Sequence, residues 1–244
     1  MPINPARIGC ATGLAILLAG CGGGGGGGGS TPTNVTPATS TFAFDTGYRT
    51  RIQSGATDNF DVSGSCVGTA RIAAAAAQAA NFEGVSGFAA SQVSSSNWVC
   101  PPSATPSVNS ISGSTYFNSA YVPIGLEITG GEYSRFEAPP AAAPGALPAS
   151  VKVGDSGTLS TSTIYADNTK AVVNGRRVVG YAIEDDTPDT AVANVITRTY
   201  SSSGELLVTQ QSRYRMPANG KLTLLSIDVQ FSTISSVHLI YTPK

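Results

Sequence analysis

The sequence predicts a mainly β protein built from antiparallel sheets. From residue 151 onward, apolar and polar residues alternate with a period of two, as in LLSIDVQF, where Leu225, Ile227, Val229 and Phe231 share one face. Turn-forming segments (EDDTPDT, SSSG, PANG) separate these runs, and short connections favour antiparallel neighbours. We expect a C-terminal six-stranded meander, either an open curved sheet or part of a barrel, beside a smaller disulfide-stapled β-rich N-terminal half.

Residues 1–20 have the organisation of a bacterial signal peptide. Arg7 precedes an apolar core at residues 11–19, which is too short to span a bilayer and has the length of a secretory h-region. The segment LAGC at residues 18–21 resembles the lipobox of bacterial lipoproteins, which implies cleavage before Cys21 and lipid attachment to its thiol. The alternatives are an ordinary secreted protein with a cysteine in its leader and a leader that stays uncleaved as an anchor.

Residues 21–41 are the predicted lipidated cysteine and tether. Eight glycines at residues 22–29 and a Ser-, Thr- and Pro-rich stretch cannot bury enough apolar surface to offset chain entropy. Such a coil typically reaches roughly 25 Å. In lipoproteins, an aspartate directly after the cysteine favours inner-membrane retention, and Gly22 stands there instead. The resemblance therefore implies an anchor in the outer membrane, with the body on its periplasmic face.

The N-terminal half, residues 42–137, is predicted to be β-rich. RIAAAAAQAANFEG, at residues 71–84, has the alanine content of a helix, but glycines punctuate the region closely. The flanking segments at residues 42–52 and 91–99 have strand-like or polar β composition. We therefore favour strands over a helix here.

A disulfide between Cys66 and Cys100 is expected. Cys10 would leave with the leader and Cys21 would be lipidated, so these two cysteines remain available to each other. Two lone thiols do not supply a zinc site, which needs more ligands. We expect Trp98 to pack beside the disulfide, with a sugar-binding platform as the alternative role.

The C-terminal half, residues 151–244, follows an Ala- and Pro-rich connection at residues 138–150, where prolines exclude a helix or a central strand. The sequence does not distinguish two independent domains from one continuous sandwich. The predicted strands of this half lie near residues 157–166, 177–184, 191–200, 205–216, 221–231 and 235–242.

Composition excludes nucleic-acid binding. The chain has 14 basic and 15 acidic residues; loss of Arg7 with the leader leaves 13 basic residues and a formal charge of −2. No basic surface able to follow phosphates is expected from this balance. The sequence also contains no P-loop, GxGxxG, HExxH or GxSxG motif, so no cofactor is expected.

One segment resembles a catalytic loop. GDSGT, at residues 154–158, is similar to the nucleophile loop of chymotrypsin-like proteases, which would make Ser156 a nucleophile. That family places its histidine before the serine, whereas the single histidine here, His238, lies far after it. A β-turn leading into a strand is the favoured interpretation of the motif. His238 is expected on the less buried face of the last strand.

Four acidic residues crowd one predicted hairpin loop and could collect calcium through hard oxygen ligands. Their spacing matches neither an EF-hand nor an RTX loop, so a solvated acidic turn is favoured and no metal site is predicted. The weak metal candidates are Glu184, Asp185, Asp186 and Asp189.

Several segments of the body also look like a group of uncharacterised proteobacterial lipoproteins. They are YFNSAYVPIG (116–125), GEYSRFEAPP (131–140), VKVGDSGTL (151–159) and RYRMPANGKLTLLSIDVQF (213–231). The resemblance supports a lipoprotein and carries no functional residue.

The first functional hypothesis is a non-catalytic lipoprotein, held at the membrane by its lipid anchor, that binds an envelope protein partner. The alternative is a carrier of a lipid or another apolar ligand in a β cavity. A serine hydrolase using Ser156 ranks third.

Overall fold

The computed structural model describes residues 41–103, 105–137, 147–232 and 237–244. The predicted leader, Cys21, nearly all of the tether and residues 138–146 of the connection lie outside the described residues. The described chain contains one helix, α2 (Phe44–Ser54), and these strands: β1 (Ala56–Gly64), β2 (Val67–Ala74), β3 (Gln78–Phe82), β4 (Val85–Val99), β5 (Ser107–Asn118), β6 (Pro123–Ile128), β7 (Tyr133–Glu137), β8 (Ser156–Tyr165), β9 (Val173–Thr187), β10 (Thr190–Ser201), β11 (Leu206–Pro217), β12 (Thr223–Phe231) and β13 (His238–Pro243).

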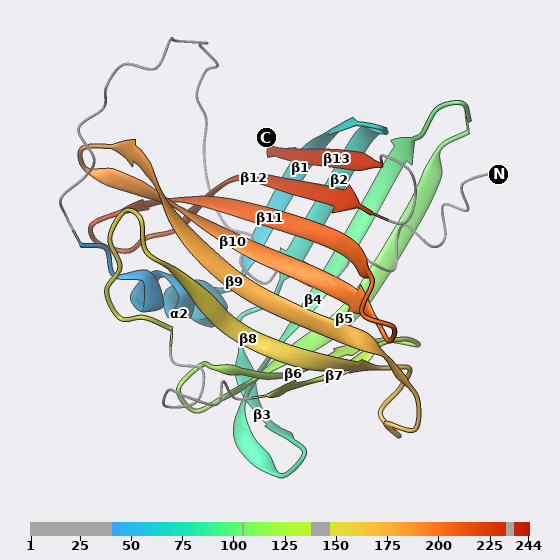
Figure 1. The fold of residues 1–244 in the computed structure, drawn as a ribbon, viewed down its shortest axis with the longest axis horizontal. Coiled ribbons are helices and arrows are strands. Elements are labelled where there is room, and N and C mark those ends of the chain that lie inside the picture. The colour runs from blue at the N-terminus through green and yellow to red at the C-terminus, as the bar shows by residue number, and fades with distance from the viewer. Residues whose placement is uncertain (1–40, 104, 138–146, 233–236) are drawn as a thin grey trace.

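Twelve of these strands form a closed antiparallel barrel. The order runs from β4 through β13 in sequence and returns through β1 and β2, and the pairing of β2 with β4 closes the ring (Figure 1). β3 stands outside the ring and pairs with the first part of β4. Closure leaves each barrel strand a partner on both sides, which removes the exposed edges of an open sheet.

The predicted antiparallel β architecture is confirmed, as is the six-stranded meander, formed by β8–β13. This meander is half of the closed barrel rather than an open sheet, because β8 pairs with β7 and β13 pairs with β1. The alanine-rich segment at residues 71–84 is β, as predicted, and contributes to β2 and β3.

The prediction of β structure at residues 42–52 is wrong, because most of this segment forms α2. Phe44, Tyr48 and Ile52 recur every four residues, so a helix places all three on one buried face. Asp45 in the first turn and Arg51 in the last turn complement the helix dipole. The helix ends before Gly55, whose φ of 67° suits glycine.

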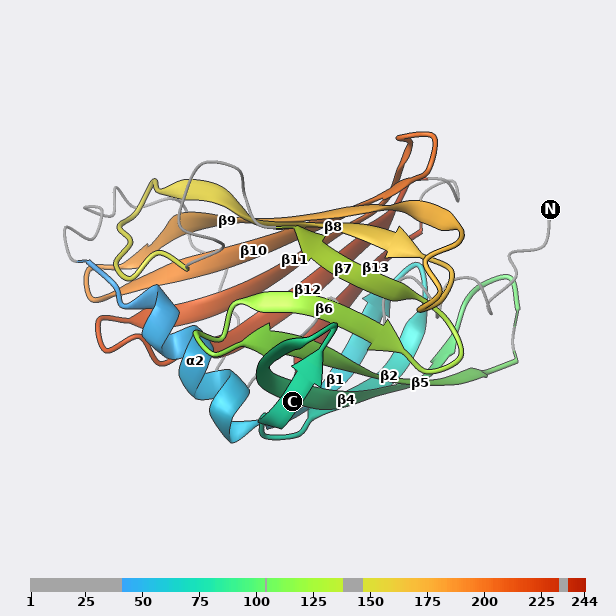
Figure 2. The same ribbon diagram turned by 90° about the horizontal axis from the view of Figure 1, so that it is seen from below.

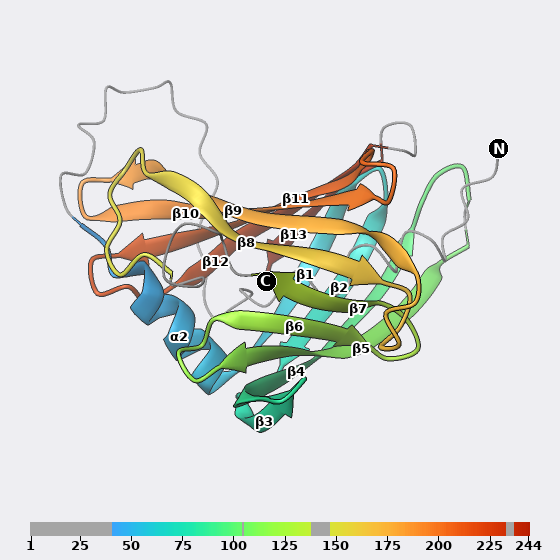
Figure 3. The ribbon, with the colours of Figure 1, turned by 60° about the horizontal axis from the view of Figure 1, so that its bottom comes forward.

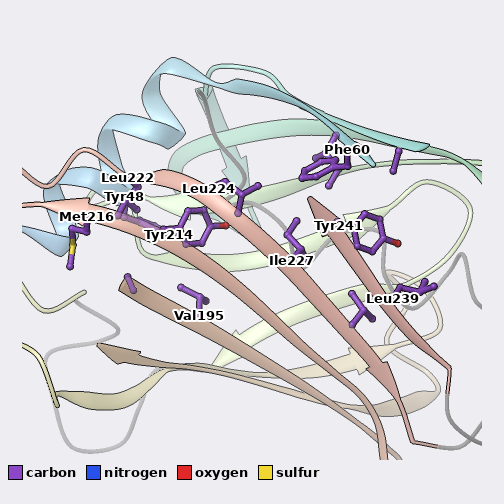
Figure 4. Close-up of a cluster of buried hydrophobic side chains, with 14 of the residues drawn as sticks. Tyr48, Phe60, Val195, Tyr214, Met216, Leu222, Leu224, Ile227, Leu239 and Tyr241 are labelled. Carbon is purple, nitrogen blue, oxygen red and sulfur yellow. The ribbon is translucent and has the colours of Figure 1, made fainter. Parts of the chain in front are cut away.

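Helix α2 packs across one end of the barrel, which we call the plugged end (Figure 2). Tyr48 lies beside Met216, near the end of β11, and Leu222, just before β12, within the buried core (Figure 4). The Phe44 ring lies 5.7 Å from that of Tyr181 on β9. Contacts with several strands fix the helix to the barrel end.

The inward positions of the C-terminal strands match the predicted alternation with one exception. Ile227, Val229 and Phe231 are buried as expected. A register shift between β11 and β12 places Leu224, rather than Leu225, opposite the fully buried Tyr214. This β-bulge adds one residue to β12 and resets which side chain faces inward.

The predicted disulfide between Cys66 and Cys100 is present. The two cysteines directly flank the pair Val67–Val99, the last pair of the β2–β4 ladder. Trp98 and Cys66 belong to the same buried core, in agreement with the expected core role of the tryptophan. The covalent link therefore lies at one end of the seam that closes the barrel.

The β3–β4 hairpin contacts the outer wall of the barrel. Phe82 stacks on Tyr116 and Tyr133 with ring centroids 4.6 and 5.5 Å away. A Cβ at Gly125 would lie 2.1 Å from the Phe82 ring, so only glycine allows this approach. Burial, followed by its hydrogen bond to Glu83, raises the pKa of Tyr133, whose hydroxyl donates to that carboxylate at 2.8 Å.

Within the described ranges, no helix combines the length and the apolar character needed to cross a membrane.

Candidate functional site

The end of the barrel opposite α2, which we call the mouth, contains an open pocket. The strands alternate in direction, so the β6–β7, β8–β9 and β10–β11 turns lie together at this end (Figure 3). The hairpin β6–β7 has strands of six and five residues, whereas β5 has 12 and β9 has 15. The rim is therefore lower at this hairpin than at β5, which begins at Ser107 and extends toward the mouth beyond the Gly113–Ile128 pair.

The pocket, which we call the mouth pocket, has a volume of about 580 Å³, within the size range of small-molecule sites. Aliphatic side chains contribute one part of its lining and polar groups contribute the other. The aliphatic residues are Ile111, Ile128, Ile164 and Leu207; the polar and charged residues are Ser110, Ser112, Thr129, Glu132, Asn174, Arg177, Thr199 and Tyr200.

Arg177 and Glu132 form a buried ion pair in this lining. The two side chains are 7% and 18% exposed. Arg177 Nη2 donates to Glu132 Oε2 at 3.1 Å, and Nη1 lies 2.8 Å from Oε1, although this second contact lacks hydrogen-bond geometry. Ser134 Oγ also donates to Glu132 Oε1 at 2.7 Å. The Glu132 carboxylate thus accepts hydrogen bonds from two side chains.

Arg177 retains donor capacity. Its Nε has no hydrogen-bond partner among the described residues. Ser162 on β8 and Thr199 on β10 stand directly opposite Arg177 in the two neighbouring ladders, so the three side chains share one face of the sheet. Ser162 is fully buried, and its Oγ also lacks a partner in the described structure. Such unsatisfied groups are costly in a protein interior unless something else meets them.

Small polar side chains continue along the barrel interior. Gln210 Nε2 donates to Ser212 Oγ at 3.2 Å on β11, and both side chains are buried. Other buried serine and threonine residues on the barrel strands are Thr115, Ser134, Ser160, Ser162 and Thr197. The interior side of β8, β10 and β11 therefore carries buried hydroxyl and amide groups among its apolar side chains.

The structure does not bring Ser156 and His238 together. Ser156 begins β8 and His238 begins β13, and four strands separate these two in the sheet order. The histidine side chain is 44% exposed, as expected for its position, and its Nε2 lies 2.8 Å from Asp228 Oδ2. A carboxylate therefore partners the imidazole, and the imidazole does not lie beside the serine.

The acidic hairpin residues are divided between arginine partners and solvent. Glu184 pairs with Arg213, and Asp186 receives two hydrogen bonds from Arg215, at 2.7 and 3.2 Å. The Arg215 hydrogen bonds hold the pKa of Asp186 below its usual value. The other two weak metal candidates, Asp185 and Asp189, are exposed. Among the described residues, no group of three or more potential ligands is placed to hold a metal ion.

Sequence reasoning missed the mouth pocket residues. Arg177 carried one usable signal, because a period of two in the strand expected near residues 177–184 places Arg177 on the same face as Val179, Tyr181 and Ile183. A charged residue on the apolar side of a strand indicates a buried partner. Nothing local marked Glu132 as that partner, 45 residues away.

No protein-family model, curated protein or solved structure matches the chain.

Proposed function

We propose that this protein is a membrane-tethered lipoprotein of the bacterial envelope that holds a small apolar ligand in its mouth pocket. The observation that carries the proposal is the pocket itself, with its aliphatic wall, at the unplugged end of a closed barrel. Closed barrels of sufficient width commonly hold ligands at one mouth. We therefore rank ligand carriage ahead of the envelope-partner role, which ranks first on sequence alone.

The proposed location rests on three observations. The segment LAGC at residues 18–21 resembles the lipobox of bacterial lipoproteins, and a glycine-rich tether follows. The disulfide is a bond typical of oxidising compartments such as the periplasm. Charged residues pair across the outer face of the barrel, as Arg213 does with Glu184, which is typical of a sheet face in contact with water.

A non-catalytic role is proposed because the residues that line the mouth pocket favour ligand binding over catalysis. A serine nucleophile needs a base within hydrogen-bond reach and a group that orients that base. Ser156 and His238 stand on strands that are not neighbours. The mouth pocket presents an ion pair and hydroxyl groups around aliphatic side chains, which is the composition of a binding site.

The test uses N-phenyl-1-naphthylamine, an uncharged probe that fluoresces in apolar surroundings. We expect saturable fluorescence with the wild-type protein. Ile164 lies 5% exposed on β8 and lines the pocket. Ile164→Trp would fill the space, so probe affinity should fall at least ten-fold.

Val172→Trp is the matched control, because this residue is 57% exposed near the mouth and does not line the pocket. The control should bind the probe like the wild type. An equal loss of probe affinity in both variants, or a wild-type protein that does not bind the probe, would contradict the proposal.

A further inference from the structure

The mouth pocket contains buried donors that its own residues leave unused. Arg177 is 6% exposed, and neither its Nε nor its Nη1 makes a hydrogen bond within the described structure. A guanidinium has five N–H donors in a fixed plane and accepts none. A ligand that completes this site must therefore bring a hydrogen-bond acceptor.

The charges of the pocket are already balanced. Glu132 and Arg177 are the charged residues of the lining, and they face each other at ion-pair distance. A carboxylate on the ligand would approach Glu132 as well as Arg177, and like charges in a partly desolvated site repel strongly. An ammonium group on the ligand would be repelled by Arg177 in the same way. An uncharged acceptor, such as an ester or amide carbonyl, avoids both penalties.

The remaining lining indicates what is attached to that acceptor. Ile111, Ile128 and Ile164 present aliphatic surface in the same pocket, and burying such surface stabilises a complex by about 25 cal/mol per Å². Hydroxyl groups on Ser112 and Thr129 lie among the other lining residues, 3.2 Å apart. An apolar chain with polar substituents at one end matches this division.

We infer that the ligand is an uncharged amphiphile, an acyl ester or amide, whose carbonyl oxygen accepts a hydrogen bond from Arg177 while its hydrocarbon chain contacts the isoleucines. This inference rests on the proposed function and narrows the ligand to one chemical class. Glu132 is a positioning residue, because it holds the guanidinium in place and cancels its charge.

The experiment compares three ligands that share a ten-carbon chain: monocaprin (uncharged ester), decanoate (anion) and decylamine (cation). Each displaces N-phenyl-1-naphthylamine from the full-length protein below its micellar concentration. Monocaprin should bind the wild type at least ten-fold more tightly than either charged ligand. If decanoate or decylamine binds best while the probe still binds, the ligand class is overturned and the proposed function stands. If the probe does not bind at all, both fail.

The Glu132→Gln variant tests whether the ligand preference shifts in the direction that the inference predicts. This change leaves the Arg177 charge without a counter-ion, so the preference should reverse toward decanoate, by at least ten-fold relative to the wild type. Glu184→Gln is the matched control, because Glu184 pairs with Arg213 on the outer face; its selectivity should be unchanged. An unchanged preference in Glu132→Gln would overturn the inference.

A double variant, Arg177→Met/Glu132→Gln, removes both charges and leaves no buried ion behind. It should bind the probe like the wild type but bind monocaprin at least five-fold less tightly, because the carbonyl loses its donor. Equal monocaprin affinity in the double variant and the wild type would contradict a hydrogen bond from Arg177.

Discussion

Arg51 and Asp58 join the helix to the barrel through one buried ion pair. Arg51 Nη2 lies 3.4 Å from Asp58 Oδ2, and the side chains are 7% and 5% exposed. Burial raises the pKa of Asp58, and the charge of Arg51 partly opposes that rise. The desolvation of the carboxylate therefore outweighs its attraction to the guanidinium, as is common for buried pairs.

Arg51→Met should destabilise the protein in a pH-dependent manner. Removing the cation leaves a buried carboxylate, at a cost of about 3 to 5 kcal/mol near pH 7. The pKa of Asp58 in the folded state would then rise further above its ordinary value of 3.8, so the folded state would bind the proton more tightly than the unfolded state. The deficit should be greatest at neutral pH and should shrink as pH falls through that raised pKa. Urea unfolding between pH 4 and pH 7 measures it.

Arg49→Met is the control on the same helix, because Arg49 is 44% exposed and pairs with Asp45 at 3.7 Å. Its effect should be small, about 0.5 kcal/mol or less, as for other exposed helix pairs. If the stability lost in Arg51→Met did not depend on pH, an ionised Asp58 could not be the cause of the loss.

The sequence predicts which side chains face inward better than it predicts which residues they pair with. Alternation correctly placed Ile227 and Val229 in the core, since a strand has a strict period of two. It misplaced Leu225, because a one-residue bulge is set by the neighbouring strand and not by the pattern itself. The pairing of Arg177 with Glu132 depends on three-dimensional closure, which no local spacing encodes.

Helix α2 is the element that the sequence did not predict. The aromatic and threonine residues of its segment favour strands, and Gly47 weakens helices. Phe44, Tyr48 and Ile52 nonetheless carry a four-residue period, and the barrel end supplies the apolar surface that this face needs. Tertiary packing overrides propensity here, as it does for most short helices.

The disulfide at the end of the β2–β4 ladder should contribute to the stability of the barrel. Cys66→Ala/Cys100→Ala should lower the free energy of unfolding by about 3 to 4 kcal/mol, because the bond closes a 34-residue separation in the unfolded chain. Chemical denaturation of the oxidised wild type and the variant measures the difference.

Reduced wild type serves as the reference, since it lacks the bond but keeps both sulfur atoms. It should match the double variant within about 1 kcal/mol, because the loop-closure contribution dominates. Indistinguishable unfolding midpoints for the oxidised and reduced wild type would show that the link adds no stability.

For the barrel as a unit, the connections between sequential strands were predictable and the closure of the ring was not. The meander β8–β13 links neighbours in sequence, so turn segments and alternation were sufficient to predict it. The seam joins β2 to β4 across the intervening β3, and β1 joins β13 across almost the whole described chain. Such distant pairings have no signature in one sequence, since any amphipathic strand could supply the partner.

Replacement of Cys21 tests the tether. Cys21→Ala removes the only thiol at the expected cleavage site, so acylation should be lost. The wild type should partition into the detergent phase with fatty acids at its N-terminus, because several acyl chains hold a protein durably at a membrane. The variant should appear in the aqueous fraction or remain unprocessed. A wild-type protein without fatty acids would contradict the lipoprotein proposal.

The described chain enters the barrel at its plugged end, where Phe42 bridges to Val151 and α2 begins. An anchor upstream of this point would therefore be attached at the floor of the barrel, far from its rim. If the proposed tether joins the anchor to this end, the mouth is the free end of the barrel and stays open to the surrounding water. Cargo would then be exchanged with molecules on that side, and departure from the anchoring leaflet would not be required for loading.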